Sequence, residues 1–331
     1  MSAGLTFLTL LLSAILPLAV TPLLRGMGIV DVPNERSSHT RPVIRGMGLA
    51  VLIALLAGIG TGLVLYPEWL LIRPVLVIGA AVLASGLLGL SEDIRGLPVL
   101  ARSLAQLAIA LGVCVALLPG SSLGPWLSLG FVIYGVLFLS SFINVANFMD
   151  GLNGISGLHG VVAGITFALC GVFSELPWLT VIGSLLAAAF AGFLPWNLLG
   201  KGVFLGDVGS YLLGGAVAAT SLAALLAGVP VLATIAPMIL YFGDSATTLV
   251  KRTRAGKKWY EPHKEHAYQR INQAGLNHLA TSGLVAGLTA VACALGLASY
   301  AVPVSLWWLL LLGGIALTAV YLRIPALLEK R

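Results

Sequence analysis

The sequence predicts an all-α integral membrane protein that crosses the bilayer about eleven times as a single domain, residues 1–331. Three observations predict this fold class: the composition, the length of the apolar runs and the distribution of charge between them. Of the 331 residues, 59% are hydrophobic and only 9% are charged, whereas a soluble domain carries roughly 25% charged residues. The mean hydropathy is +1.02. Together these values exclude an ordinary soluble domain.

Apolar runs long enough to cross the hydrocarbon core recur along the whole chain. A spanning helix needs about 20 predominantly apolar residues, and backbone groups away from water must be paired within a helix or a closed barrel. The runs lack the alternation of barrel strands, so we expect helices. The neutral start of the chain and Arg25 after the first run favour a retained span over a cleaved signal peptide. The expected spans are 3–24, 47–66, 74–90, 100–119, 126–143, 155–173, 178–196, 209–228, 230–249, 278–301 and 305–322.

The segments between these runs alternate in charge. By this assignment 17 of the 18 Lys and Arg residues lie on one side of the membrane, with Arg73 as the exception. Cytoplasmic loops are enriched in Lys and Arg, so we expect the N-terminus outside and the C-terminus in the cytoplasm. The same enrichment explains the net charge of +6 better than nucleic-acid binding does. The expected cytoplasmic loops lie near 25–46, 91–99, 144–154, 197–210 and 250–277.

The acidic residues also gather on this side. Ten of the twelve Asp and Glu residues lie there or at its membrane boundary, and the two others are Glu68 and Glu175. The positive-inside tendency has little hold on acidic residues, so we expect a functional cause. Glu92 and Asp93 are adjacent carboxylates at the end of the third span, where their repulsion favours a nearby metal or one protonated member. A solvated loop with an Asp–Arg contact is the alternative.

Polar groups at membrane depth mark the segment at the end of the fifth span. Asn144, Asn147 and Asp150 are three residues apart, which places them near one side of a helix end. Amides and carboxylates are costly in the membrane unless they face a cavity or a ligand. We therefore expect these side chains to line a binding pocket, with a purely structural hydrogen-bond network between helices as the alternative.

Two further segments suit an anionic ligand. At the start of the eighth span, Gly206 would let a diphosphate approach the backbone, a helix N-terminus favours anions, and Asp207 can hold Mg2+ against phosphate oxygens. A helix N-cap is the alternative role for Asp207. In the first loop, Arg41 and Arg45 precede a glycine-flanked helix start, which suits phosphate. Contact with lipid headgroups explains these arginines equally well.

The long loop 250–277 combines cations with aromatic residues. His263 and His266, three residues apart, could share a helix face, but two such ligands without a cysteine do not favour zinc. The cations, with the neighbouring Trp259 and Tyr260, suit a nucleotide diphosphate better. Asp244 is the one carboxylate that we place clearly within a span, so we expect it to have a cationic or polar partner.

The order and content of these segments resemble the polyprenyl-phosphate N-acetylhexosamine-1-phosphate transferases, a family that includes the phospho-MurNAc-pentapeptide translocase and the enzymes that initiate O-antigen and teichoic acid synthesis. The long loop is most similar to the O-antigen-initiating branch. The family usually has two aspartates where this chain has Glu92 and Asp93, and often an aspartate where Asn153 stands. The matching segments are Glu92-Asp93, Asn144-x-x-Asn147-x-x-Asp150-Gly151, Phe204-x-Gly206-Asp207-x-Gly209-Ser210 and Pro262-His263-x-x-His266-Ala267-Tyr268-Gln269-Arg270.

The resemblance implies an enzyme of the bacterial inner membrane with its active site on the cytoplasmic face. It would transfer an N-acetylhexosamine-1-phosphate, or a 6-deoxy analogue, from a UDP-sugar to undecaprenyl phosphate and release UMP, as the first membrane step of O-antigen-like synthesis. Mg2+, or Mn2+, would be the cofactor. Glu92, Asp93, Asp150 and Asp207 would be catalytic, with Asp207 and Asp150 holding the metal. The implied substrate-binding residues are Arg41, Arg45, Asn144, Asn147, Asn153, Gly206, His263, His266 and Arg270.

A secondary transporter or lipid flippase is the alternative function. Transporters bind their substrates near the midplane of the membrane, often between broken helices. Here the polar groups lie at the expected cytoplasmic ends of the spans, and only Asp244 lies deeper. The pattern therefore favours an enzyme at the membrane surface. The sequence does not identify the sugar or the oligomeric state, and it leaves a homodimer open.

Overall fold

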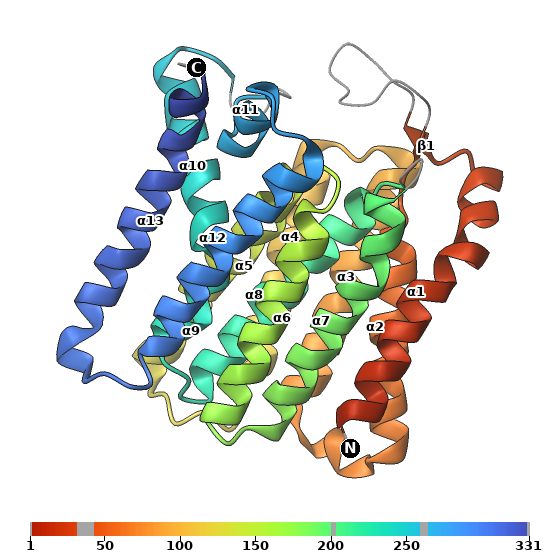
Figure 1. The fold of residues 1–331 in the computed structure, drawn as a ribbon. Helices are drawn as coiled ribbons and strands as arrows, with labels where there is room; N and C mark the ends of the chain where they lie inside the picture. Colours follow the sequence, from red (N-terminus) through yellow and green to blue (C-terminus); the bar gives the residue numbers. More distant parts are fainter. Residues whose placement is uncertain (1, 32–42, 200–202, 259–263, 330–331) are drawn as a thin grey trace.

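The computed structural model describes residues 2–31, 43–199, 203–258 and 264–329. Within these ranges the chain is helical almost throughout, and the long helices lie side by side in one bundle (Figure 1). The all-α membrane fold predicted from the sequence is confirmed. Among the described residues, ten helices are long and apolar enough to cross a membrane: α1 (Ser2–Gly26), α2 (Gly48–Leu65), α3 (Arg73–Arg95), α4 (Val99–Leu117), α5 (Pro125–Phe148), α6 (Ile155–Phe173), α7 (Pro177–Leu198), α8 (Gly206–Leu226), α12 (His278–Ala298) and α13 (Trp307–Leu328).

The ninth apolar run departs from the predicted continuous span at 230–249. It is divided into α9 (Val231–Ile235), the 3-10 turn η2 (Ala236–Met238) and α10 (Ile239–Arg254). Pro237 gives the physical reason, because proline has no N–H for the helix ladder and its ring clashes with the preceding turn. The expectation of eleven continuous spans is therefore wrong at this run. In Figure 1, α9 and α10 nevertheless follow each other from the lower toward the upper end of the bundle.

Short elements cluster at the two ends of the bundle. The strands β1 (Val30–Asp31) and β2 (Val43–Ile44) form a two-residue antiparallel ladder. In Figure 1, β1, α11 (Ala267–Gln273) and the C-terminus lie at the upper end, and the N-terminus lies at the lower end. The remaining short elements are η1 (Pro67–Leu71) and η3 (Val304–Leu306). The termini thus lie at opposite ends of the bundle; which end faces the cytoplasm stays a prediction.

Helix α8 forms the centre of the bundle, since nearly all its side chains are buried, whereas α4 and α13 keep most of theirs on the outside. Small residues let its neighbours approach closely, as expected in membranes. A Cβ on Gly89 of α3 would overlap the carbonyl oxygen of Asp207, and one on Gly214 would lie 2.6 Å from the Cα of Ile143 in α5. All three cysteines are free and buried.

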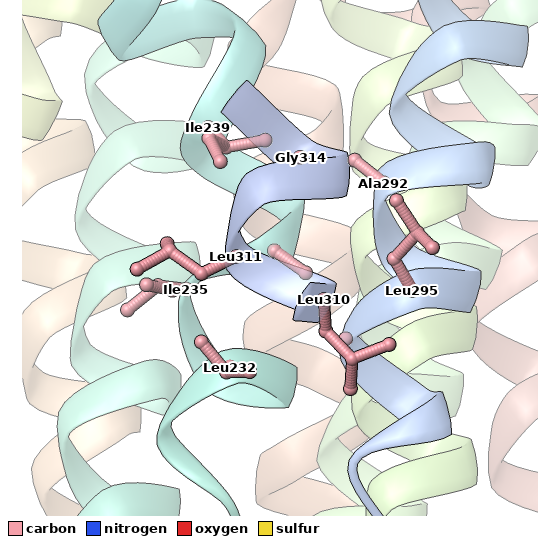
Figure 2. A pocket seen from close by; sticks show the side chains of 10 residues that line it. Leu232, Ile235, Ile239, Ala292, Leu295, Leu310, Leu311 and Gly314 are labelled. Carbon is pink, nitrogen blue, oxygen red and sulfur yellow. The ribbon is translucent and has the colours of Figure 1, made fainter. Parts of the chain in front are cut away.

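The break in the ninth run adjoins an apolar pocket between α9, α10, α12 and α13. Figure 2 shows Leu232, Ile235 and Ile239 on one side of it, and Leu295 and Leu311 on neighbouring helices. Every residue that lines this pocket is aliphatic or glycine. It therefore offers no side-chain donor or charge to a nucleotide, and the polar chemistry of the molecule lies elsewhere.

Candidate active site

The contact between α3 and α8 places a carboxylate at a helix N-terminus. Oδ1 of Asp93 accepts the backbone N–H of Asp207 at 3.0 Å, and Oδ2 accepts that of Val208 at 2.9 Å. The first N–H groups of a helix have no partner within the helix, so Asp93 supplies the cap of α8 from another helix. Its side chain is completely buried. The solvated loop that was the alternative interpretation of Asp93 does not occur.

Arg45 connects this cap to the side chain of Asp207. Its Nε lies 2.8 Å from Oδ1 of Asp93, and its Nη2 lies 2.5 Å from Oδ2 of Asp207. The segment that carries Arg45 is held by backbone hydrogen bonds on both sides, from Phe204 N to Ile44 O at 2.8 Å and from Met47 N to Phe204 O at 3.0 Å. The first loop and the start of α8 therefore form one unit.

The glycines of this unit are packed against protein backbone. Gly206 has a φ of +75°, a conformation that favours glycine. A Cβ on Gly206 would lie 2.5 Å from the backbone nitrogen of Gly46 and 2.7 Å from Oδ2 of Asp93. A Cβ on Gly48 would overlap the backbone of Gly209. In the structure these glycines thus serve the close approach of two chain segments, and a contact of Gly206 with substrate stays a prediction.

Asp207 faces a second helix end through its other oxygen. Nδ2 of Asn147, near the end of α5, donates to Oδ1 of Asp207 at 2.6 Å and to Oγ of Ser210 at 3.1 Å. The side chain of Asp207 does not cap its own helix, whose N-cap residue is Leu205. The carboxylate is instead held between an amide and a guanidinium. This arrangement brings together Arg45, Asn147 and Asp207. That these side chains line a binding pocket stays a prediction.

Asp150 lies two residues beyond α5, in the segment that leads to α6. Burial raises the pKa of Asp150 to about 8, and the charges of Asp207 and Asp93 add to the increase while Arg45 opposes it. The carboxyl group therefore shares the electrostatic field of the other two aspartates. Three acidic groups from three different parts of the chain thus lie at this end of the bundle, within electrostatic reach of one another.

The donor set of this cluster fits a magnesium ion. The charged groups that act most strongly on Asp150 are two further carboxylates and one guanidinium, which leaves an excess of negative charge. Mg2+ is commonly held by one or two carboxylates, with waters and substrate phosphates filling its remaining positions. In the described part of the chain, no group of three or more His, Cys, Asp or Glu side chains is arranged to hold a metal ion by itself. Asp207 and Asp150 are therefore suited to a shared, substrate-completed site rather than to a closed cage.

Glu92 and Asp93 are neighbours in sequence but have separate partners. Oε1 of Glu92 lies 3.1 Å from Nη1 of Arg102, and its Oε2 accepts the backbone N–H of Leu97 at 2.9 Å. Asn144 also has a partner outside the cluster, because its Nδ2 donates to Oε1 of Gln106 at 2.5 Å. Gln106 is a buried amide within an apolar run, and this polarity is the sequence signal that could have identified it.

Asn153 belongs to a neighbouring network at the start of α6. Its backbone N–H donates to Nδ1 of His278 at 3.3 Å, and its carbonyl accepts from Oγ of Ser282 at 2.8 Å. Asn197, which the sequence reasoning missed, lies 2.5 Å from the next backbone nitrogen, that of Gly154, through its Oδ1. Asn197 is a buried amide near the end of an apolar run, which is the same signal as for Gln106. Among the contacts of the described residues, none joins the side chain of Asn153 to Asp207.

The remaining predicted residues divide into three groups. Arg41 of the first loop and His263 of the long loop lie outside the described residues. His266 is the N-cap of α11 rather than a member of a helix face, and its Nδ1 lies 3.2 Å from Oδ1 of Asp244. This contact confirms that Asp244 has a polar partner. Arg270 forms an ion pair with Glu329 of the C-terminal segment, with Nη2 2.8 Å from Oε1, and not with the aspartate cluster.

The fold and the site define a polytopic helical membrane protein with an acidic cluster at one end of its bundle, and the comparisons specify its family. The model of glycosyl transferase family 4 matches residues 75–225. A decaprenyl-phosphate N-acetylglucosaminephosphotransferase of Mycolicibacterium smegmatis is 30% identical over 298 residues, or 76% of this chain and 70% of the relative. The chain therefore belongs to the family of polyprenyl-phosphate N-acetylhexosamine-1-phosphate transferases.

Two further relatives extend the likeness. A probable undecaprenyl-phosphate N-acetylglucosaminyl 1-phosphate transferase of Bacillus subtilis is 26% identical over 81% of this chain and 77% of the relative. A phospho-N-acetylmuramoyl-pentapeptide-transferase of a Synechococcus strain is 28% identical over 91% of each chain. The likeness thus runs through nearly the whole bundle and includes the segments that carry Asp93, Asp150 and Asp207.

Proposed function

We propose that this chain transfers an N-acetylhexosamine-1-phosphate, or a 6-deoxy analogue, from a UDP-sugar to undecaprenyl phosphate and releases UMP. The observation that carries the proposal is the meeting of Asp93, Asp150 and Asp207 at one end of the bundle with Arg45 between two of them. Such a cluster suits a cation and a diphosphate. The similarity of the long loop to the O-antigen-initiating branch supports a place in the first membrane step of an O-antigen-like polysaccharide.

The chemistry asks the protein mainly for positioning and charge neutralisation, because phosphoryl transfer needs little covalent help. An oxygen of the lipid phosphate attacks the sugar-side phosphorus, and the bond from this phosphorus to the oxygen of departing UMP breaks. Mg2+ bound by Asp207 and Asp150 would neutralise diphosphate charge. Asn147 orients Asp207 through its 2.6 Å hydrogen bond. When substrate binds, Arg45 would give up its contact with the carboxylate of Asp207 and bind a phosphate oxygen instead.

The contacts of Asp93 favour a positioning role over that of a general base. Its two oxygens accept two backbone N–H groups and face Arg45, and no water-exposed surface is left on the side chain. A phosphate monoester has a second pKa near 6, so the acceptor is already mostly a dianion at neutral pH. In this proposal Asp93 holds Asp207 in place. Glu92 contributes to the structure of the same helix end through its ion pair with Arg102.

The remaining predicted contacts are with the donor and acceptor. His266 and His263, with Arg41 and Arg270, would bind the phosphate charge that grows on departing UMP, and Asn153 would contribute to the nucleotide pocket. The support is strongest for His266, because it lies beside the ring of Phe148 at the end of α5, two residues from Asp150. For Arg270 the ion pair with Glu329 would have to open.

The broken ninth helix is the one feature typical of a transporter, and it argues against that function here. Transporters use the freed groups of broken helices to bind substrate. The carboxylate in this segment, Asp244, is instead occupied by protein donors from α10, α11 and α13. The polar groups that suit a cation and a diphosphate lie instead in the aspartate cluster at the end of the bundle.

Purified protein tests the proposal directly. With labelled UDP-N-acetylglucosamine or a 6-deoxy analogue, UMP release should require both undecaprenyl phosphate and Mg2+, and Mn2+ should substitute. Asp207→Asn should lower turnover by about 100-fold or more, because a metal-binding carboxylate is lost. UMP release without lipid phosphate, or wild-type turnover in Asp207→Asn, would refute the assignment. A transporter or flippase predicts no UMP release.

We also propose that this end of the bundle faces the cytoplasm of a bacterial inner membrane. The support is the assignment from the sequence, which puts every Lys and Arg except Arg73 on this side of the membrane. Because the three native cysteines are buried, single cysteines at the exposed Lys257 and Glu175 can report the orientation. In intact cells, an impermeant thiol reagent should label Glu175→Cys and spare Lys257→Cys. The reverse pattern would overturn the orientation.

A further inference from the structure

Asp244 is a completely buried carboxylate in the broken ninth segment, and five protein donors converge on it. Its Oδ2 accepts from the hydroxyl of Tyr321 at 2.6 Å, and its Oδ1 accepts from the backbone N–H of Ala267 at 3.0 Å. Nδ1 of His266 and Oγ1 of Thr248 both lie 3.2 Å from Oδ1. The backbone N–H of Tyr268 lies farther away, at 3.5 Å. One side chain thus joins three helices, α10, α11 and α13.

The donors around Asp244 bear on which ring nitrogen of His266 carries the hydrogen. An ionised carboxylate only accepts hydrogen bonds and has about four lone-pair positions, so the donors around Asp244 suit its ionised form. A histidine nitrogen donates to such an acceptor when it carries the proton, so the contact with Oδ1 favours the tautomer of His266 with the hydrogen on Nδ1. The substrate contact proposed for His266 therefore falls to the other ring nitrogen, Nε2.

The same contacts place α11 against the segment that carries Asp150. The hydroxyl of Tyr268 donates to the carbonyl of Phe148 at 2.9 Å. A Cβ on Gly151 would overlap this hydroxyl, so the two segments are in close contact on both sides of Asp150. The ring of His266 lies 6.1 Å from that of Phe148, centroid to centroid. Through α11, the position of Asp244 is transmitted to the end of α5.

We propose that Asp244 is a positioning residue of the transferase site, which fixes the orientation and tautomer of His266 and holds α11 against the Phe148–Gly151 segment. Tyr321 is its support from α13, so the C-terminal helix takes part in building the site. This role deepens the proposed function and rests on it. The carboxylate itself touches protein donors only among its described contacts, and it acts through His266 and α11.

A double-mutant cycle on the full-length protein tests whether Asp244 acts through His266. Asp244→Asn, His266→Gln and the double variant are compared with wild type for kcat and for KM of the UDP-sugar. We expect Asp244→Asn to lower kcat by roughly 10- to 100-fold, as for a carboxylate that orients a functional histidine. The double variant should lose clearly less than the product of the two single losses, because part of the effect of Asp244 passes through His266. Losses that multiply would overturn the proposal.

A second pair of variants applies if Asp244→Asn does not fold. Tyr321→Phe removes one hydroxyl that bonds Asp244, and Tyr300→Phe removes a hydroxyl of the same kind that bonds Ser174 and the carbonyl of Cys170, away from the site. Both should lower the melting temperature slightly. Only Tyr321→Phe should lower kcat, by several-fold. Equal kcat values in the two variants would overturn the role of Tyr321 and of the carboxylate it supports.

The imidazole can also be observed without turnover. In protein with isotope-labelled histidine, of which the chain has five, the nitrogen NMR signals of His266 should show the proton on Nδ1 in wild type and lose this preference in Asp244→Asn. An unchanged tautomer in that variant would refute the contact. This result is independent of catalysis, so it separates the inference from the proposed function, which fails if wild type releases no UMP.

Discussion

Oδ1 of Asp93 lies 3.0 Å from the backbone nitrogen of Asp207. The side chain of one aspartate in the cluster thus binds the main chain of another. The contact joins the last turn of α3 to the first turn of α8. It shows how a carboxylate without exposed surface can determine the position of the neighbouring Asp207.

Asp93→Asn is expected to lower both stability and turnover. The substituted amide replaces one acceptor with a donor, so one backbone N–H of α8 loses its cap, at a cost of about 1–2 kcal/mol. Asp207 then shifts, and kcat should fall roughly 10- to 100-fold. Thermal unfolding in detergent and UMP release measure the two effects. Glu92→Gln, whose partner Arg102 is partly exposed, should destabilise by less than about 1 kcal/mol. A melting temperature unchanged in Asp93→Asn would contradict the capping role.

Gly89→Ala should disturb the site through packing alone. The new methyl group would overlap the backbone carbonyl of Asp207, which can yield only if α8 moves. Overpacking of this kind costs about 1–3 kcal/mol, and turnover should fall with it. Gly112→Ala on α4 is the matched control, because its Cβ would meet no atom within 4 Å. It should retain full activity and gain up to about 1 kcal/mol of stability. Similar losses in both variants would show that helix propensity, not contact, is responsible.

Asn147→Ala and Asn144→Ala compare two amides one turn apart on α5. Asn147 donates to the carboxylate of Asp207, whereas Asn144 donates to Gln106. We expect Asn147→Ala to reduce kcat by roughly 10- to 100-fold and to weaken Mg2+ activation. Asn144→Ala should mainly lower stability, by about 1 kcal/mol for the lost hydrogen bond. Steady-state kinetics over a range of Mg2+ concentrations distinguish the two, and equal kinetic losses would place Asn144 in the ligand pocket as well.

Mg2+ binding should depend on pH through Asp150. Burial raises its pKa to about 8 in the metal-free protein, so the carboxyl group is mostly protonated at neutral pH. Because this proton must leave before the carboxylate binds a cation, Mg2+ affinity should rise with pH, up to about tenfold per unit, and level above 8. Calorimetry in buffers of different ionisation enthalpy measures the released proton. Asp150→Asn should bind Mg2+ more weakly and release none; an equal release from this variant would assign the proton elsewhere.

The same raised pKa has a consequence for stability. The unfolded-state pKa is near the ordinary value of 3.8, below the folded-state value of about 8. The stabilising contribution of the protonated group is thus fully present below pH 3.8, declines as the pH rises, and is lost above pH 8. Without Mg2+, the melting temperature of wild type should fall between pH 6 and 8 more than that of Asp150→Asn. If the melting temperatures of the two proteins fell equally between pH 6 and 8, the predicted loss of stability through Asp150 would be contradicted.

Much of the fold could be predicted because lipid imposes a simple rule on sequence. Each apolar run of sufficient length had to become a helix, and ten of them did within the described residues. The ninth run met the same rule by composition, but Pro237 interrupts its backbone ladder and divides it. Hydropathy averages over a window and does not detect one missing N–H.

The site was predictable to the level of its residue types and less so in their contacts. Asp207 and Asn147 were expected in one pocket and do meet, since both are polar groups at helix ends on one side of the membrane. The cap from Asp93 to α8 could not be read from the sequence, because the two segments are 114 residues apart. Asn197 and Gln106 were missed because each is a single amide in an apolar run, without a motif around it.

The sequence by itself determined the membrane class, the alternation of the spans and the gathering of acidic groups at one side, because these follow from local hydropathy and charge. The tertiary structure alone decided which group each carboxylate serves. Asp93 holds a helix end, Asp207 lies between Arg45 and Asn147, and Asp244 anchors α11. The physical reason is that a buried carboxylate must find donors, and only the packing of distant helices determines which donors lie within reach.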